Sequence, residues 1–128
     1  RMASMMSPTI IEHCKNHMFD QKIALGTGGS NRIKTAMFQV IWHIIAENKT
    51  LDNAINLPRI HYENGVLDVE KGINSDTVEL LESLYKNSTI WQQRSLYFGG
   101  INAVQAGSKH LAVSDSRRNG LGMVKLTI

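Results

Sequence analysis

The clearest pattern in the chain is a helical repeat that follows a glycine-rich segment at residues 26–31 (GTGGSN). From position 33 onward, apolar residues recur three and four positions apart, which places them on one face of an α-helix. These residues are Ile33, Ala36, Met37, Val40, Ile41, Ile44 and Ile45. Phe38 and Trp42 widen the apolar face, so the pattern predicts a helix that is covered on more than one side. We expect Ser30 or Asn31 to be its N-cap.

Two short strands are predicted before the glycines. Residues 7–12 (SPTIIE) are rich in β-branched side chains, and residues 18–25 (MFDQKIAL) return to apolar sequence after a polar interval. That interval, residues 13–17 (HCKNH), is predicted to be the turn of a hairpin that joins the two strands.

Two more helices are predicted in the middle of the chain. Residues 50–57 form the first, with Thr50 as its N-cap and Pro58 setting its end. Residues 75–86 form the second, with Ser75 as its cap. The apolar side of this second helix consists of Val78, Leu81, Leu84 and Tyr85.

The remaining predicted strands are short and separated by turn residues. Residues 59–62 (RIHY) and 66–70 (VLDVE) flank the turn at 63–65. After residue 88, glycines divide further strands, the best of which are 101–107 (INAVQAG), 110–115 (HLAVSD) and 121–128 (LGMVKLTI). This order of strands and helices predicts an α+β fold, in which an antiparallel sheet carries helices on one face.

Composition narrows the possible functions only slightly. With 128 residues, 42% of them hydrophobic and 20% charged, the chain fits one globular domain or one piece of a larger one. The net charge of +3 is mild and the basic residues are dispersed, so no nucleic-acid partner is predicted. No apolar run approaches the roughly 20 residues of a membrane span, and the opening ten residues lack the apolar core of a signal peptide. The single cysteine, Cys14, allows no internal disulfide.

His13, Cys14 and His17 bring two imidazoles and a thiol close together, which raises the possibility of a metal site. Structural zinc takes four ligands, usually in two pairs, and the chain offers no second pair. The competing interpretation is a solvated hairpin turn, which the pattern favours. We therefore predict no metal site.

The glycine-rich segment is the strongest candidate for chemistry. It lacks the G-K-[ST] ending of a Walker phosphate loop, and Asn31 stands where the last glycine of G-x-G-x-x-G would be. A strand, a glycine turn and a helix N-terminus nevertheless present free N–H groups and a positive dipole end to a ligand. Such a turn suits a developing oxyanion as well as a phosphate. From the residues alone, a functional turn and a purely structural left-handed turn both stay open.

Four stretches, read in order, resemble the C-terminal part of the small subunit of γ-glutamyltransferases. MASMMSPTI resembles the family's L-S-S-M-S-P-T-I, and GTGGSNRIKTAMFQVI resembles G-S-P-G-G-x-R-I-x-T-x-x-x-Q-V. LPRIHYENGVLDVEKG resembles A-P-R-F-H-H…L-x-V-E-x-G, and SDSRRNGLG resembles S-D-P-R-R-x-G-x-A. The order and spacing hold over essentially the whole chain.

The resemblance implies an N-terminal-nucleophile (Ntn) hydrolase with a four-layer αββα sandwich. Members of the family cut themselves, and the new N-terminal threonine of the small subunit attacks a γ-glutamyl amide such as that of glutathione. Water or an amine then resolves the γ-glutamyl ester, so the family acts as hydrolase and acyltransferase. The resemblance implies no cofactor and no metal, and it implies the large subunit as a partner. Family members are often periplasmic, extracellular or at the cell surface.

Residue by residue, the family's paired oxyanion-hole glycines match Gly29 and Ser30. Serine departs from the pattern at the second position, but its backbone N–H supplies the same donor. The adjacent serines that help hold the substrate's α-carboxylate in the family match Ser4 and Met5. Methionine offers no donor there, which puts a standard glutathione-type substrate in doubt.

The nucleophilic threonine of the family lies well upstream of the serine pair, and Thr9 matches an internal threonine instead. We therefore expect residues 1–128 to be a single piece of an enzyme, without its nucleophile segment and inactive alone. The alternative is a non-catalytic binding or scaffold fragment of a degenerate family member. A T-x-H-x-x-x-D-like start upstream would distinguish the two.

Overall fold

The computed structural model describes residues 6–15 and 18–125 of the chain. Ser4 and Met5 lie outside these residues. The strands are β1 (Thr9–Lys15), β2 (Met18–Gly28), β3 (Ile60–Glu63), β4 (Val66–Val69), β5 (Ser88–Ile90), β6 (Gly100–Gly107) and β7 (Leu111–Ser114). The α-helices are α1 (Ile33–Ile45), α2 (Leu51–Asn56) and α3 (Ser75–Leu84). Three short 3₁₀ helices are η1 (Ser30–Arg32), η2 (Leu96–Phe98) and η3 (Ser116–Arg118).

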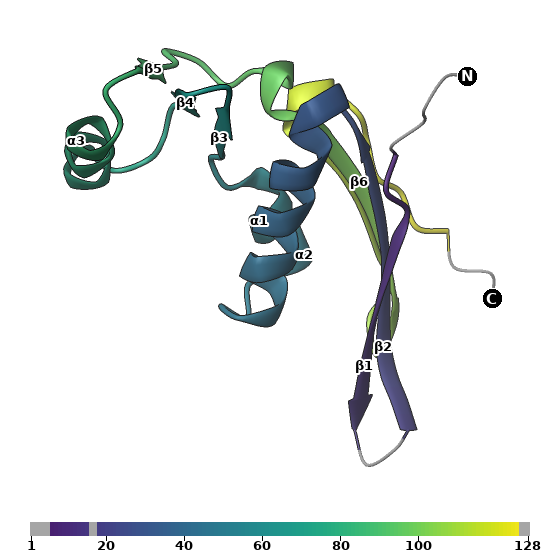
Figure 1. Ribbon diagram of the computed structural model, residues 1–128. Helices are drawn as coiled ribbons and strands as arrows, with labels where there is room; N and C mark the ends of the chain where they lie inside the picture. Colours follow the sequence, from purple (N-terminus) through teal and green to yellow (C-terminus); the bar gives the residue numbers. More distant parts are fainter. Residues whose placement is uncertain (1–5, 16–17, 126–128) are drawn as a thin grey trace, which may run out of the picture.

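The main sheet has four antiparallel strands in the order β1-β2-β6-β7, and α1 and α2 lie on one of its faces (Figure 1). The register of its central pair runs without a break from Gln21 opposite Gly107 to Gly28 opposite Gly100. The predicted α+β fold with helices on one face of an antiparallel sheet is confirmed.

Alternate side chains of the main sheet face the helices and form the core. On β2 these are Ile23 and Leu25, and their neighbours on β6 are Ile101 and Ala103. The helices contribute Ile33, Ala36, Met37, Val40, Leu51, Ala54 and Ile55. Burial of one aliphatic side chain contributes about 1.5–3 kcal/mol to the free energy of folding. The contacts of this single layer therefore hold α1 and α2 on the sheet.

A second sheet has the order β3-β4-β5 and forms, together with α3, an arm that projects from the body of the molecule (Figure 1). The pairing of β3 with β4 is antiparallel, but that of β4 with β5 is parallel. Helix α3 connects β4 to β5, and a helical crossover lets two strands run in the same direction. A purely antiparallel arrangement is therefore correct for the main sheet and wrong for this pair.

The hairpin before the glycines is confirmed, but its predicted turn is too long. Strand β1 continues to Lys15, so His13 and Cys14 belong to the strand, with His13 opposite Gln21. Backbone pairing up to Lys15 opposite Met18 outweighs the polar character of this segment. The predicted strand at 121–128 is also wrong over its described part, because residues 121–125 form no strand.

Two predicted helix caps are wrong and one is confirmed. Ser30 lies within η1, and α1 begins at Ile33 without any side-chain cap. Asn74 rather than Ser75 caps α3, since its Oδ1 accepts a hydrogen bond from the backbone N–H of Thr77 at 2.8 Å. Thr50 caps α2 as predicted.

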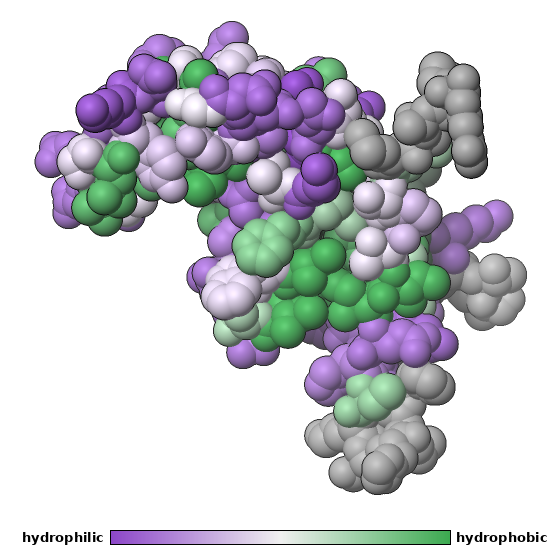
Figure 2. Space-filling view, in the orientation of Figure 1, coloured by the Kyte–Doolittle hydropathy of each residue, from purple (hydrophilic) through white to green (hydrophobic). Residues whose placement is uncertain are grey.

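The outer face of α1 is open in the described part of the chain. Phe38 and Trp42, expected to be covered, are 66% and 53% exposed and stack on each other with ring centroids 6.2 Å apart. Apolar side chains gather over α1 and the sheet beside it in Figure 2. Of the described helices, none is long and apolar enough to cross a membrane.

Candidate functional site

The glycine-rich segment forms a tight turn between β2 and α1. Strand β2 ends at Gly28, and the chain then passes through Gly29 with φ of 147° and Ser30 with φ of 57° before entering α1. The backbone N–H of Arg32 donates to the carbonyl oxygen of Gly29 at 3.3 Å, which closes the turn. The positive φ of Ser30 costs of order 1–3 kcal/mol in a non-glycine residue. The surrounding structure must therefore hold the turn in place.

Thr27 fastens the turn to the start of β6 from below. Its buried hydroxyl lies 3.0 Å from the carbonyl oxygens of both Gly28 and Gly100, and it accepts a hydrogen bond from the N–H of Gly100 at 3.2 Å. A side chain thus joins the ends of the two strands where their backbone ladder stops.

A polar chain of side chains flanks the turn on the side of β3. Asn31 donates through Nδ2 to Oε1 of Glu63 at 2.6 Å, and Oε2 of Glu63 lies 3.4 Å from Nε2 of His61. The Nδ1 atom of His61 lies 2.8 Å from the hydroxyl of Thr35, in the first turn of α1. These contacts connect the turn, at Asn31, through β3 to the first turn of α1, at Thr35.

A second group of contacts holds the turn on the side of η2. Arg32 donates from Nε to the carbonyl oxygen of Tyr97 at 2.9 Å, and its guanidinium carbon lies 4.5 Å from the centre of that ring. The hydroxyl of Tyr97 donates to Asp68 at 2.7 Å, and Trp91 donates to the other oxygen of Asp68 at 2.9 Å. Burial, followed by the hydrogen bond to Asp68, raises the pKa of Tyr97 to about 12. Tyr97 therefore remains a donor at neutral pH.

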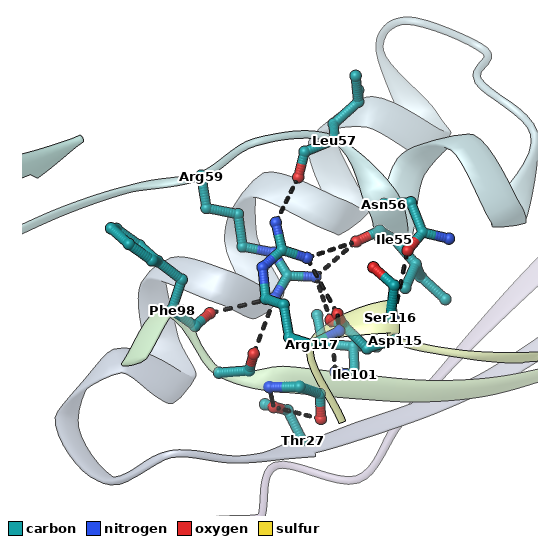
Figure 3. A network of polar contacts seen from close by, with 12 residues as sticks. Thr27, Ile55, Asn56, Leu57, Arg59, Phe98, Ile101, Asp115, Ser116 and Arg117 are labelled. Atoms are coloured by element: carbon teal, nitrogen blue, oxygen red, sulfur yellow. Dashed lines mark hydrogen bonds and ion pairs between the residues drawn. The ribbon is translucent and has the colours of Figure 1, made fainter. Parts of the chain in front are cut away.

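Beneath the turn lies a buried ionic network of Arg59, Asp115, Arg117 and Glu70, the first three of which are labelled in Figure 3. Asp115 receives Nη2 of Arg59 at 2.7 Å and Nη1 of Arg117 at 3.0 Å on different oxygens. Arg117 also pairs with Glu70, through Nε at 2.7 Å and through Nη2. Figure 3 shows both guanidinium groups converging on Asp115 and on the carbonyl oxygen of Ile55.

Contacts within the network determine which of its side chains keep their charge. Burial opposes the charge on Asp115, but Arg59 and the N–H groups of Arg117 and Ile101 outweigh it and hold the pKa of Asp115 below its ordinary value. Burial lowers the pKa of Arg59, while the contacts of Arg117 with Glu70 and Asp115 overcome burial and raise the pKa of Arg117. The network is a structural support whose ions are mutually neutralised.

This support reaches the glycine turn through Gly99. The Nη1 atom of Arg59 donates to the carbonyl oxygens of Phe98 at 3.1 Å and Gly99 at 3.3 Å. A Cβ atom built on Gly29 would lie 3.2 Å from Cα of Gly99. Beside it, the side chain of Arg118 lies across the strand ends, since a Cβ on Gly100 would stand 2.3 Å from its Nε.

The structure brings only some of the predicted site residues together. Gly29 and Ser30 lie together at the junction of β2 and α1. Ser4, Met5 and His17 fall outside the described residues, whereas Cys14 is exposed on β1 and the ring of His13 lies 3.7 Å from Asp20. Residues 6–15 and 18–125 contain no group of three or more His, Cys, Asp or Glu side chains that could hold a metal.

Sequence reasoning missed the ionic network and both flanking clusters. The signal was partly present, because Arg59, Asp115 and Arg117 stand in the stretches PRIHY and SDSRR that carried the family resemblance. Glu63, Tyr97 and Asp68 offered no comparable signal, since only the fold brings them to the turn.

Comparison with known proteins places these features in a family. The pattern of the family described as Gamma-glutamyltranspeptidase matches residues 1–124. The chain is 38% identical over 87 residues to the glutathione hydrolase proenzyme of Escherichia coli (strain K12), covering 65% of the chain and 14% of that protein. It is 30% identical over 132 residues to the glutathione hydrolase proenzyme of Pseudomonas aeruginosa, covering 97% of the chain and 22% of that protein. The chain thus spans only a small part of the curated relatives that it matches.

Solved structures show the same fold. The W525D mutant of the gamma-glutamyltranspeptidase from Pseudomonas nitroreducens matches with a TM-score of 0.77 and 26% identity, over 99% of this chain and 65% of that one. The transpeptidase enzyme CapD of Bacillus anthracis matches with a TM-score of 0.77 and 23% identity, over 99% of this chain and 74% of that one. The fold is that of Ntn-hydrolase gamma-glutamyltranspeptidases. The chain belongs to the gamma-glutamyltranspeptidase family.

Proposed function

We propose that the chain supplies the oxyanion hole and part of the substrate site of an enzyme that transfers or hydrolyses γ-glutamyl groups through an acyl-enzyme. The observation that carries the proposal is the turn of Gly29 and Ser30, which joins a strand to a helix in a member of this family. Among the described residues, no acceptor receives the backbone N–H of Gly29 or of Ser30. Within residues 6–15 and 18–125, both donors are therefore available to a ligand above the turn.

The chemistry required of these donors is simple. A threonine hydroxyl attacks the γ-glutamyl carbonyl carbon, the threonine's own amine takes the proton, and the carbonyl oxygen becomes an oxyanion. Two backbone N–H groups that already point at the oxyanion stabilise it without reorganising. The tetrahedral intermediate then expels the amine, which takes up the proton, and leaves a γ-glutamyl ester for water or an acceptor amine. The threonine belongs to the part of the enzyme upstream of the stretch that contains Ser4.

Ser4 and Met5 are the proposed contacts to the substrate's α-carboxylate. The hydroxyl of Ser4 can donate to the carboxylate, whereas Met5 has no donor. We therefore expect weaker binding of the substrate's α-carboxylate than in a family member with two serines at these positions. Amide chemistry at the turn does not depend on this difference, because the oxyanion donors are backbone groups.

The rest of the enzyme, including the large subunit, is the proposed protein partner. One apolar groove of about 390 Å³ lies between α1 and α3, and its walls include Phe38, Trp42, Pro58, Ile73 and Leu81. On the face of the main sheet opposite the helices, Ile10 and Val104 are exposed, and Leu121 and Met123 of the segment after η3 are exposed beside them. Exposed apolar faces of this kind support burial against other parts of a larger protein.

The proposal is tested by assaying the complete enzyme with a chromogenic γ-glutamyl anilide. When resolution of the ester is slower than acylation, the acyl-enzyme accumulates and a burst of released aniline precedes the slower turnover. Ser30→Pro, which removes one backbone donor, must slow the burst. A complete protein that lacks an upstream T-x-H-x-x-x-D-like start and cleaves no γ-glutamyl amide would instead identify a non-catalytic scaffold.

A further inference from the structure

We propose that Glu63 is a positioning residue for the glycine turn, acting through Asn31 on the backbone N–H of Ser30. The inference rests on the proposed role of this turn as an oxyanion hole. Glu63 comes from β3, more than 30 residues away in the sequence, and its contact with the turn is the side chain of Asn31. It acts by fixing the residue that follows Ser30.

Asn31 is the point at which the turn is held from outside. It is the central residue of η1, between Ser30 and Arg32, and its Nδ2 donates to Oε1 of Glu63 at 2.6 Å. Ser30 has a φ of 57°, a conformation that a serine readily leaves when nothing restrains it. Since the peptide units of Ser30 and Asn31 are consecutive, fixing Asn31 restricts the direction of the Ser30 N–H.

The carboxylate of Glu63 is itself fixed by a buried neighbour. Its Oε2 lies 3.4 Å from Nε2 of His61, whose side chain is only 4% exposed. A carboxylate only accepts hydrogen bonds, so the contact with Glu63 requires the hydrogen on Nε2. The Nδ1 atom of the same ring lies 2.8 Å from the hydroxyl of Thr35, which donates its own hydrogen to the carbonyl oxygen of Arg32 at 3.1 Å. Thr35 lies in the first turn of α1, so these contacts connect both η1, at Asn31, and the start of α1, at Thr35, to β3.

The opposite side of the turn has its own restraint, which makes the two sides separable. Arg32 is bound to the carbonyl oxygen and the ring of Tyr97. Loss of Glu63 therefore leaves the turn attached on one side and free to pivot on the other. Because oxyanion donors act in the transition state, such pivoting lowers kcat for acylation and leaves KM nearly unchanged.

The experiment measures single-turnover acylation of the complete enzyme by a chromogenic γ-glutamyl anilide. Glu63→Ala and Asn31→Ala are each expected to lower the acylation rate about tenfold, with KM within about twofold, since small misplacement of reacting groups is costly. The double variant is expected to be no slower than the slower single variant, because both changes break the same bond. Glu82→Ala, which removes an exposed carboxylate on α3, is the matched control and keeps the normal rate.

A reciprocal exchange separates positioning from general damage to the fold. Asn31→Asp places a second carboxylate against Glu63 and should be at least as slow as Asn31→Ala. Adding Glu63→Gln restores a donor and an acceptor with their roles exchanged, and we expect most of the acylation rate to return. Recovery cannot come from a merely destabilised fold, and thermal melting of each variant checks that it is folded.

The outcomes distinguish this inference from the proposed function. Normal acylation in Glu63→Ala and Asn31→Ala, beside a slow Ser30→Pro enzyme, overturns the role of Glu63 and leaves the oxyanion turn intact. Additive losses, or failure of the exchange to recover activity, overturn it as well. Normal acylation in a folded Ser30→Pro enzyme overturns the proposed function itself.

Discussion

Gly29 packs directly against Gly99, so that a Cβ atom on Gly29 would stand 3.2 Å from Cα of its neighbour. Gly99 is in turn held by Arg59, which donates to its carbonyl oxygen from the buried ionic network. The backbone of the proposed oxyanion turn therefore rests on a second glycine whose position is set by charged residues in the core.

The first prediction concerns Ser30. If its N–H is an oxyanion donor, the side chain is dispensable, and Ser30→Ala and Ser30→Gly should acylate within a few-fold of the normal rate. Ser30→Pro removes the N–H, and loss of one such donor costs about 10²–10³ in kcat. Single-turnover kinetics of the complete enzyme, with melting curves alongside, measure both effects.

Gly29 should tolerate less than Ser30. Its φ of 147° is strained for any residue with a side chain, and the added methyl group of Gly29→Ala would press on Gly99. We expect Gly29→Ala to lose more acylation activity than Ser30→Ala, and to melt at a lower temperature. Equal kinetics for the two alanine variants would show that the turn does not face the reacting carbonyl.

Met5→Ser should strengthen the grip on the substrate. It restores a hydroxyl donor to the proposed α-carboxylate site, and a hydrogen bond to a charged group contributes about 1.5–3 kcal/mol. The expected result is a kcat/KM for γ-glutamyl substrates higher by about tenfold or more. Ser4→Ala is the companion variant and should lower the same constant; unchanged values in both would remove these residues from the substrate site.

Asp115→Asn should destabilise the protein strongly. It leaves Arg59 and Arg117 without their shared carboxylate in a buried site, and breaking a buried ion pair costs about 3–5 kcal/mol. Thermal melting of the complete enzyme should show a large drop, whereas Glu79→Gln on the exposed side of α3 should show none. A drop no larger than that of the control would mean that the network contributes little.

The raised pKa of Tyr97 leads us to expect that the folded protein loses stability at alkaline pH. Its pKa is about 12 in the folded protein and about 10 when unfolded, so the folded state favours the protonated phenol. The resulting stabilisation is complete below about pH 10 and is lost as the pH rises from there towards 12. Tyr97→Phe lacks the titrating group, so its melting temperature should depend less on pH in this window than that of the unchanged enzyme. Parallel curves for the two proteins would contradict the prediction.

Isolated residues 1–128 should cleave no γ-glutamyl anilide if the nucleophile lies elsewhere in the enzyme. Their apolar groove and the open face of the main sheet also favour aggregation. Light scattering and the anilide assay on the purified piece test both statements, and measurable turnover would contradict the first.

Local sequence determined the elements that depend on neighbouring residues. The repeat from Ile33 to Ile45 gave α1 its length, Thr50 and Pro58 set the ends of α2, and alternation in β2 selected the face turned towards the helices. Each of these follows from periodicity or capping within a few residues. The family motifs identified the glycine turn, and they also contain Arg59, Glu70, Asp115 and Arg117, but nothing in them indicated that these four residues form one ionic network.

Tertiary structure decided everything that depends on contacts between distant segments. Backbone pairing extended β1 through His13 and Cys14, and a helical crossover made β5 parallel to β4. Asn31 meets Glu63 across 32 positions, and Arg59 meets Asp115 across 56. No local sequence pattern predicts these long-range contacts, because the packing of the sheet against the helices determines which side chains become neighbours. The sequence thus determined which residues form the turn, and the fold decided what holds it in place.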